Sequence, residues 1–354
     1  MKRINVYKQT EAMAIDVKAK GMPGKVYNLA AGDPNLPVCD ALKETFAEVD
    51  FDKTHNYGSS QGELSLRNRL WHNPNQVIIA DGAKQLMYEA LATVTKPGDR
   101  VVLIGPCWTS YMRQCEILGL DYVLLTGEEA ERYIPSLELV EETVTPSTAA
   151  VVINNPCNPT GVVYPEAYIE GLYDITQKNE CFLIADEIYQ FLTDDIVMTL
   201  RGMDDVIVID GFSKCMNISG WRMGYAIADE KIIRSMTALQ SQLSGPPSTL
   251  FQTVIADAWP GIELADFTEY RKRIDCLCDI DKFSRHRPQG GFYFYLPVDD
   301  RWSSSVELCE YMLEKYSIAL TPGDDYGVER TVRISVANIT TEELMEIKEF
   351  LREI

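Results

Sequence analysis

Residues 206–224 read VIVIDGFSKCMNISGWRMG. The first four form an uninterrupted apolar run, which is typical of a strand buried on both faces of a parallel sheet. Polar residues and glycines follow at once, among them Ser213 and Lys214. Ligands of a doubly wound sheet bind beyond the carboxyl ends of its strands. The stretch therefore predicts a strand that ends in a ligand-binding turn.

Similar apolar runs recur on the N-terminal side of this stretch. They occupy residues 101–104, 122–125, 150–153 and 182–185, and longer helical patterns separate them. Each run is too apolar to have one wet face. Strands that alternate with helices indicate an α/β domain built on a parallel sheet.

The pattern changes near residues 246–247. A helical stretch follows, then an apolar run at 292–296, an alternating run at 331–336 and a charged C-terminal helix. With 354 residues the chain is long enough for a second, smaller α+β lobe. We expect three parts: an N-terminal arm and small-domain segment at 1–38, a large domain at 39–240, and a small C-terminal domain at 241–354.

Composition excludes several classes of partner. The net charge of −20 repels nucleic acid and anionic membranes, which bind cationic surfaces. No apolar signal segment opens the sequence, and no run reaches the roughly 18 apolar residues of a membrane span. The nine cysteines contain no Cys-x-x-Cys pair, and the three histidines lack metal-ligand spacing. We expect a soluble, cytoplasmic protein that acts on small molecules and holds no metal.

The chemistry gathers at the ends of the predicted strands. Taken alone, Lys214 could be an exposed turn lysine, Asp186 a helix cap and residues 158–161 a plain turn. Together they supply what one cofactor needs. A lysine amine condenses with an aldehyde, an aspartate pairs with a pyridinium nitrogen, and helix amides with an arginine bind a phosphate.

Residues 211–224 resemble the lysine signature of the class I and II aminotransferases, which are fold-type I enzymes that use pyridoxal 5'-phosphate (PLP). The resemblance covers nearly the whole chain. It implies the aspartate aminotransferase-like fold: a large α/β domain with a mostly parallel seven-stranded sheet, and a smaller α+β domain. Other segments agree in the family's order, namely LAAGDP at 29–34, YGSSQG at 57–62, PGD at 97–99, NPCNPTG at 155–161, DEIY at 186–189 and RIS at 333–335.

The resemblance implies roles at the cofactor ring. Lys214 would carry PLP covalently and then move a proton between the substrate Cα and the cofactor C4'. Asp186 would keep the pyridine nitrogen protonated, and Tyr189 and Asn158 would hydrogen-bond the phenolic oxygen. Trp108 would stack on the ring. A capping role for Asp186 and a packing role for Trp108 remain alternatives.

Other residues match the family's phosphate site. Gly82, Ala83 and Lys84 would present backbone N–H groups at a helix N-terminus. Ser213 would donate a hydroxyl bond and Arg222 a bidentate pair. Ala83 departs from the pattern because it offers no hydroxyl.

Tyr57 resembles the tyrosine that reaches the phosphate of the neighbouring subunit, which implies a homodimer with shared active sites. A turn tyrosine before Gly58 is the alternative. For the substrate, Arg333 matches the arginine that forks onto the α-carboxylate, and Gly32 and Asn158 would complete that site. A solvated arginine on a strand edge is the alternative for Arg333.

These matches predict a PLP-dependent aminotransferase that moves the amino group of an α-amino acid to a 2-oxo acid by a ping-pong mechanism. A PLP-dependent C–S β-lyase or a cyclase/synthase of the same fold is the first alternative, because these activities share the motifs. A PLP-binding regulator without turnover is a remote one. Short segments at 69–76 and 252–270 depart from typical members, so the sequence leaves the amino acid and the pathway open.

Overall fold

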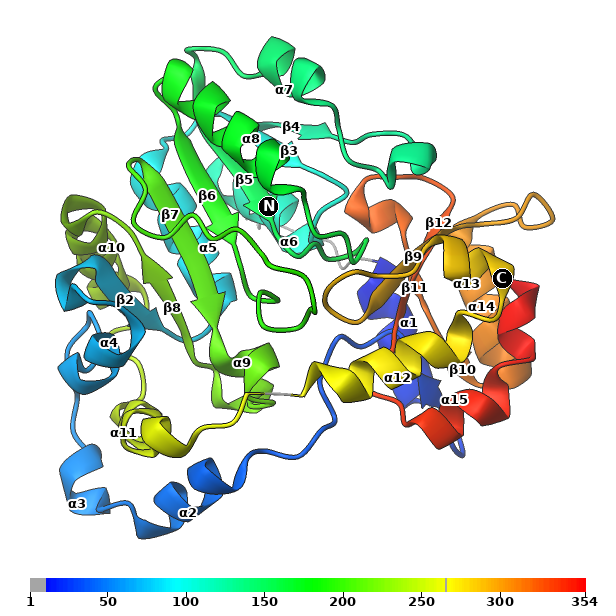
Figure 1. Cartoon of the computed structure of the whole chain (residues 1–354), viewed down its shortest axis with the longest axis horizontal. Coiled ribbons are helices and arrows are strands. Elements are labelled where there is room, and N and C mark those ends of the chain that lie inside the picture. Colours follow the sequence, from blue (N-terminus) through cyan, green and yellow to red (C-terminus); the bar gives the residue numbers. More distant parts are fainter. Residues whose placement is uncertain (1–10, 265) are drawn as a thin grey trace, which may run out of the picture.

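The computed structural model describes residues 11–264 and 266–354, so residues 1–10 of the expected N-terminal arm lie outside the described residues. Figure 1 shows a larger α/β lobe beside a smaller one. Across the described ranges, no helix combines the length and the apolar character needed to cross a membrane. All nine cysteines are free thiols, and no group of histidine, cysteine and acidic side chains in the described ranges could hold a metal ion.

A seven-stranded sheet organises the large lobe, in the order β2-β8-β7-β6-β5-β3-β4. The strands from β7 to β4 pair in parallel, and β8 runs antiparallel to both of its neighbours. This confirms the expected mostly parallel sheet. The strands are β2 (Val77–Ala80), β3 (Arg100–Ile104), β4 (Asp121–Leu125), β5 (Thr148–Asn154), β6 (Phe182–Asp186), β7 (Val206–Gly211) and β8 (Gly224–Ile227).

One detail of the predicted strands is wrong. The run at 122–125 was expected to have no wet face, yet Tyr122, Val123 and Leu124 are only partly buried. The reason is position, because β4 lies at the edge of the sheet and pairs with β3 alone.

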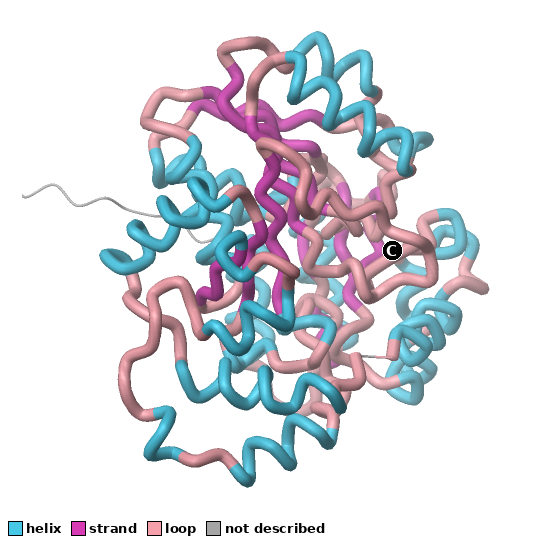
Figure 2. The backbone as a smooth tube through the Cα atoms, turned by 60° about the vertical axis from the view of Figure 1, so that its left-hand side comes forward, coloured by secondary structure: helices cyan, strands magenta, loops and turns pink. Residues whose placement is uncertain are grey.

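Helices cover both faces of this sheet. Strand side chains alternate between the faces, so Ala150 and Val152 of β5 pack in one core while Val151 and Ile153 pack in another. Figure 2 shows the strands inside and the helices around them. The helices on the first face are α5 (Ala83–Val94), α6 (Thr109–Leu118) and α10 (Glu230–Leu243), and those on the second are α7 (Leu137–Thr143) and α8 (Glu166–Lys178).

A further core lies against β2 and β8. There Ile79 and Ile227 meet Val254 and Ile255 of α11. Helix α11 falls inside the segment 241–354 that the sequence assigns to the small domain, although it packs on the large sheet. We therefore propose that the large lobe extends to the end of this helix. The helices in this region are α2 (Asp40–Glu48), α3 (Phe51–Thr54), α4 (Leu64–Leu70) and α11 (Thr249–Ala258).

The small lobe combines segments from both ends of the chain. Strand β1 (Tyr27–Asn28) pairs in parallel with β10 (Ile318–Ala319). A three-stranded antiparallel sheet has the order β11-β12-β9, with β11 (Thr321–Pro322), β12 (Thr331–Ser335) and β9 (Tyr293–Pro297). Its helices are α1 (Glu11–Lys20), α12 (Phe267–Leu277), α13 (Asp281–Arg285), α14 (Ser305–Tyr316) and α15 (Thr341–Ile347).

Candidate active site

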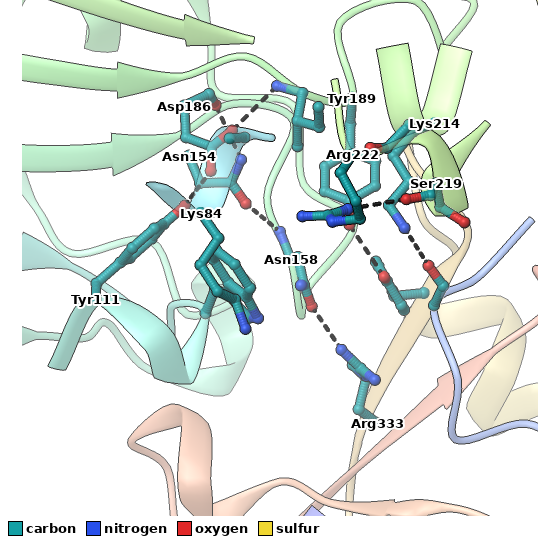
Figure 3. A pocket seen from close by; sticks show the side chains of 16 residues that line it. Lys84, Tyr111, Asn154, Asn158, Asp186, Tyr189, Lys214, Ser219, Arg222 and Arg333 are labelled. Atoms are coloured by element: carbon teal, nitrogen blue, oxygen red, sulfur yellow. Dashed lines mark hydrogen bonds between the residues drawn. The ribbon is translucent and has the colours of Figure 1, made fainter. Parts of the chain in front are cut away.

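A cavity of about 470 Å³ lies where the carboxyl ends of the large-lobe strands meet the small lobe. Figure 3 shows its side chains converging from both lobes. Eleven of the residues that the sequence singled out line it, and Gly82 and Tyr57 do not. The lining residues are Gly32, Ala83, Lys84, Trp108, Tyr111, Asn154, Asn158, Asp186, Ile188, Tyr189, Ser213, Lys214, Ser219, Arg222, Tyr293 and Arg333.

Lys214 extends into the cavity from the short helix α9 (Phe212–Cys215), which follows β7 directly. Its Nζ donates a hydrogen bond of 2.5 Å to the carbonyl oxygen of Gly32. Burial lowers the pKa of this amine to about 8; Asp33 opposes that shift, and Arg333 and Arg222 add to it. A depressed pKa brings a lysine closer to the free base that condensation and proton transfer require.

Asp186 ends β6 and is 4% exposed. Its Oδ2 accepts a bond of 2.5 Å from the Tyr111 hydroxyl, and its Oδ1 accepts one of 3.1 Å from the Ile188 amide. Burial raises the pKa of this carboxyl to about 6, although both hydrogen bonds oppose the shift. The bond to Ile188 forms within a turn, and no helix begins at this point, so Asp186 is not a helix cap. The rest of the carboxylate faces the cavity, where a positively charged ring nitrogen would be its natural partner.

Two asparagines connect Asp186 with Arg333, which reaches the cavity from the small lobe. Asn154 donates from its Nδ2 to the Asp186 carbonyl oxygen at 2.9 Å, and its Oδ1 accepts from the Asn158 backbone amide at 2.7 Å. Asn158 in turn accepts at Oδ1 a bond of 3.0 Å from Arg333. The hydroxyls of Tyr189 and Tyr293 lie 3.0 Å apart. Tyr293 also packs against the Arg333 guanidinium, so Tyr189 and Asn158, the groups expected around the phenolic oxygen, are linked through Arg333 by a ring contact as well as by hydrogen bonds (Figure 3).

Gly82 precedes α5 with φ 92°, a left-handed conformation that favours glycine. A Cβ at this position would lie 2.6 Å from an Nη atom of Arg222. The Arg222 guanidinium donates to the backbone carbonyls of Ser219 at 2.8 Å and Asp81 at 3.2 Å. Gly82 thus lets the arginine approach the N-terminus of a twelve-residue helix, which makes an anion-binding cradle.

Lys84 contributes a side chain as well as a backbone amide. Its Nζ lies over the Trp108 ring, 4.8 Å from the ring centroid. Burial and the nearby Arg222 lower the pKa of Lys84. Trp108 is half-buried and meets Tyr111 edge to face. It therefore serves both the cavity and the packing of α6.

These features fit PLP. The buried amine of Lys214 suits the aldehyde, and the buried carboxylate of Asp186 suits the pyridine nitrogen. The cradle that Gly82 leaves open in front of Arg222 suits the phosphate.

Arg333 enters the cavity from β12 of the small lobe and is 7% exposed, which excludes the solvated edge arginine. Beside its bond to Asn158, it donates to the Ala30 carbonyl oxygen at 2.7 Å. Its guanidinium lies over the rings of Tyr293 and Tyr326, at 4.5 and 5.0 Å from their centroids. Its Nε makes no hydrogen bond within the described part of the chain. A carboxylate ligand would satisfy this buried cation.

Gly32 lies on the same side of the cavity as Arg333 and Tyr293. A Cβ there would come within 1.8 Å of the Tyr293 hydroxyl, so only glycine leaves room for that ring. Tyr57 lies elsewhere and is 94% exposed in the single chain. Its predicted contact with a phosphate requires a second chain and stays a prediction.

The sequence did not single out four polar residues of the cavity: Tyr111, Asn154, Ser219 and Tyr293. Asn154 ends an apolar run, and Ser219 lies within the stretch 206–224, so the position of each in the sequence could have indicated a cavity residue. The Ser219 hydroxyl donates to the carboxylate of Asp33. Tyr111 lies in the first turn of α6, three residues after Trp108, which immediately precedes that helix. Tyr293 lies inside an apolar run and resembled a core residue.

Comparisons with known proteins agree with this geometry. The family model for aminotransferase class I and II matches residues 24–351. The aspartate aminotransferase of Thermotoga maritima is 31% identical, with 99% of this chain and 98% of the relative covered. The enzyme of that name from Bacillus subtilis is 29% identical at the same coverage. The solved aspartate aminotransferase from Thermus thermophilus with maleate superposes with a TM-score of 0.90 at 27% identity, covering 98% of this chain and 97% of that one.

Proposed function

Because the chain belongs to the class I and II aminotransferases and is a PLP-dependent aminotransferase, we propose that its amino donor is aspartate. The enzyme acts on an amino acid and a 2-oxo acid, and the comparisons do not favour the β-lyase and cyclase alternatives.

One observation carries the choice of a dicarboxylic substrate. Besides Lys214 and Arg222, which are assigned to the cofactor, the cavity presents two further cations, Lys84 and Arg333, that form no ion pair with a carboxylate among the described residues. Arg333 suits the α-carboxylate because its planar guanidinium can donate two parallel hydrogen bonds to the two carboxylate oxygens. Lys84 offers a point charge for a second carboxylate. The names of the relatives support this assignment, as does the Thermus structure with maleate, which is itself a dicarboxylate.

The cavity residues that the sequence singled out then have roles in the reaction. When bound, PLP supplies an electron sink that stabilises negative charge at the substrate Cα. Lys214 binds the cofactor and afterwards moves the proton at Cα with its Nζ. Asp186 holds a proton at the pyridine nitrogen, and Tyr189 and Asn158 hydrogen-bond the phenolic oxygen.

The two ends of the ligands are held by separate groups. The N-terminal amides of α5, the Ser213 hydroxyl and Arg222 bind the phosphate. Trp108 stacks on the ring, and Arg333 with Gly32 and Asn158 binds and orients the α-carboxylate.

We also propose a homodimer in which Tyr57 completes the phosphate site of the neighbouring subunit. Several large apolar side chains near Tyr57 are exposed in the single chain, including Phe51 at 59% and Leu64 at 53%. Exposed apolar groups that gather in one region mark an interaction surface. Nine free thiols suit a reducing compartment, which supports a cytoplasmic location.

A panel of amino acids tests the substrate. We expect aspartate to convert the bound cofactor to its amine form faster than alanine or phenylalanine does. Lys84→Met should reduce kcat/KM for aspartate by about 10- to 100-fold, because one hydrogen bond to a charged group is lost, and should leave alanine unaffected. Lys96→Met, at an exposed lysine after α5, is the control. Equal losses for aspartate and alanine would refute the second carboxylate site, and release of ammonia, pyruvate and a thiol from a cysteine thioether added to the panel would favour a β-lyase.

A further inference from the structure

A cluster of charged side chains lies behind the cavity, next to the cofactor-binding residues in sequence. Glu187 follows Asp186 directly, and Asp210 lies four residues before Lys214. Both carboxylates are buried, at 2% and 1% exposure. Arg201 lies between them, and none of these three residues lines the cavity.

Asp210 is surrounded by donors. Its Oδ2 accepts bonds of 2.6 Å from both the Arg201 guanidinium and the Tyr225 hydroxyl, and another from the Gln190 side chain. Its Oδ1 accepts the backbone amide of Gly211 at 2.6 Å. Gly211 opens the helix that carries Lys214. Asp210 thus fixes the start of that helix.

Glu187 is held in a similar way on the neighbouring strand. It accepts from the Thr199 hydroxyl at 2.8 Å, from the Leu200 amide at 2.9 Å and from Arg201 Nε at 3.3 Å. Arg201 therefore connects the end of β6 with the end of β7, from which Asp186 and Lys214 reach the cavity.

The charges of this region do not balance. Arg201 pairs with Glu187 and Asp210 but not with Asp186, so the region holds three buried carboxylates and one guanidinium and is negative when all are ionised. Burial raises the pKa of Glu187 and of Asp210, and Arg201 opposes the shift in both. A buried ion cluster is a poor source of stability compared with apolar packing. An excess of negative charge next to a cofactor site has an electrostatic use instead.

Four cations line the cavity in front of Asp186, namely Lys84, Lys214, Arg222 and Arg333, whereas the titratable groups packed directly against it are neutral at neutral pH. Tyr111 faces it from α6, Cys157 from the loop after β5 and Tyr189 from its own loop, and burial raises the pKa of all three. Asp210 on β7 is different, because its charge raises the pKa of Asp186. Among the groups behind the cavity, this cluster is therefore the one whose charge changes the electrostatic potential at Asp186.

We propose that Glu187, Arg201 and Asp210 are positioning residues for transamination that set the negative potential at Asp186. Through Asp186 they favour the protonated form of the bound cofactor. This inference rests on the proposed pairing of Asp186 with the pyridine nitrogen.

The test is a pH titration of the visible absorption band of the PLP-bound protein. Asp210→Asn removes a negative charge and should lower the midpoint of the band by about half a unit or more. Arg201→Lys keeps the charge and should shift it little. Glu89→Gln, which removes a buried carboxylate from α5 away from the cluster, is the matched control and should leave the midpoint unchanged.

Removing a charge and keeping it separate this role from a structural one. If the cluster only supported the fold, Arg201→Lys, which breaks the guanidinium contacts but keeps the charge, would shift the midpoint as much as Asp210→Asn does, or neither variant would shift it, and either result overturns the proposal. Glu187→Gln should lower the midpoint as Asp210→Asn does, so the test stands if Asp210→Asn fails to fold. Asp186→Asn distinguishes a failure of the cofactor assignment from a failure of the present inference. If it leaves the midpoint unchanged, the cofactor assignment fails; if it shifts the midpoint while the cluster variants do not diverge, only the present inference fails.

Discussion

The two walls of the cavity are assembled in different ways. On the large-lobe wall, Asp186, Asn158 and Lys214 follow three strands that are neighbours in the sheet, β6, β5 and β7. On the opposite wall, Arg333 bonds to the carbonyl of Ala30, and 303 residues separate the two. The first wall follows from the topology of one sheet, whereas the second exists only when distant parts of the chain have met.

This difference also divides the chemistry. The large-lobe wall holds the groups assigned to the cofactor and to proton transfer. The other wall holds Arg333, Tyr293 and Gly32, which are placed to bind the substrate. Substitutions on the two walls should therefore fail in different steps, and the predictions below test this division.

The largest effect is expected at Lys214. Lys214→Ala should abolish covalent attachment of PLP, so that borohydride reduction followed by mass spectrometry finds no adduct. Turnover should fall by about 10,000-fold, because the general base is lost as well as the covalent anchor. Lys231→Ala, at an exposed lysine on α10, should behave like the wild type. A reduced adduct on any other lysine of the wild-type protein would refute the assignment of the first wall.

Arg333→Lys tests the second wall. We expect kcat/KM for aspartate to fall by about 2 to 4 kcal/mol, because a lysine cannot reproduce the planar fork of a buried guanidinium. PLP affinity should change much less, and fluorescence titration with PLP measures it separately. Arg352→Lys, at an exposed arginine near the C-terminus, is the control. If the variant keeps its kcat/KM for every accepted amino acid, another residue must hold the carboxylate.

A third prediction concerns the free energy of unfolding of the cofactor-free protein. Folding lowers the pKa of Lys214 from an ordinary value of 10.5 to about 8, so the folded protein is penalised wherever the lysine is protonated when unfolded. The penalty is complete below pH 8 and disappears as the pH rises to 10.5. Lys214→Met should therefore be more stable at pH 7 by about 3 kcal/mol. Its advantage in urea unfolding should shrink between pH 8 and pH 10.5, and a constant advantage would contradict the prediction.

The smallest effect is expected at Tyr57, which belongs to neither wall of its own chain. Tyr57→Phe should weaken PLP retention by about 1.5 to 3 kcal/mol, the value of one hydrogen bond to a charged group. Analytical ultracentrifugation should show an unchanged dimer. Tyr173→Phe, on α8 of the large lobe, controls for the loss of a hydroxyl. A fully active monomer would rule out a site shared between subunits.

The sequence predicted the first wall more completely than the second. Asp186, Asn158 and Lys214 each follow an apolar run, and a parallel sheet brings such positions to one edge. Their distances and pKa shifts did not follow from the pattern, because burial depends on the packed lobes. The RIS motif predicted Arg333 on the second wall, but no motif indicated Tyr293. Its position in β9 turns its side chain toward the cavity, where the hydroxyl contacts Tyr189 and leaves no room for a Cβ at Gly32.

The features of the fold that the sequence could not predict have a related cause. Apolar content predicted the strands, but it could not show that β4 lies at the sheet edge. Nor could it show that α11 packs on the large sheet. Strand order and helix docking depend on contacts between residues far apart in sequence, which local patterns do not contain.

The pairing of the first strand with the late part of the chain also has a consequence for biosynthesis. Thr321 donates its hydroxyl hydrogen bond to the carbonyl oxygen of Ala30, across 291 residues of intervening chain. At about 5 to 20 residues per second, a ribosome needs roughly 15 to 60 seconds to make that interval. The large lobe can begin to fold in this time, while Leu29 and Ala30 still lack the core in which they are buried. The nascent chain must therefore carry an unpaired strand through most of its synthesis, and a chaperone that shields residues near its beginning would be most useful in that period.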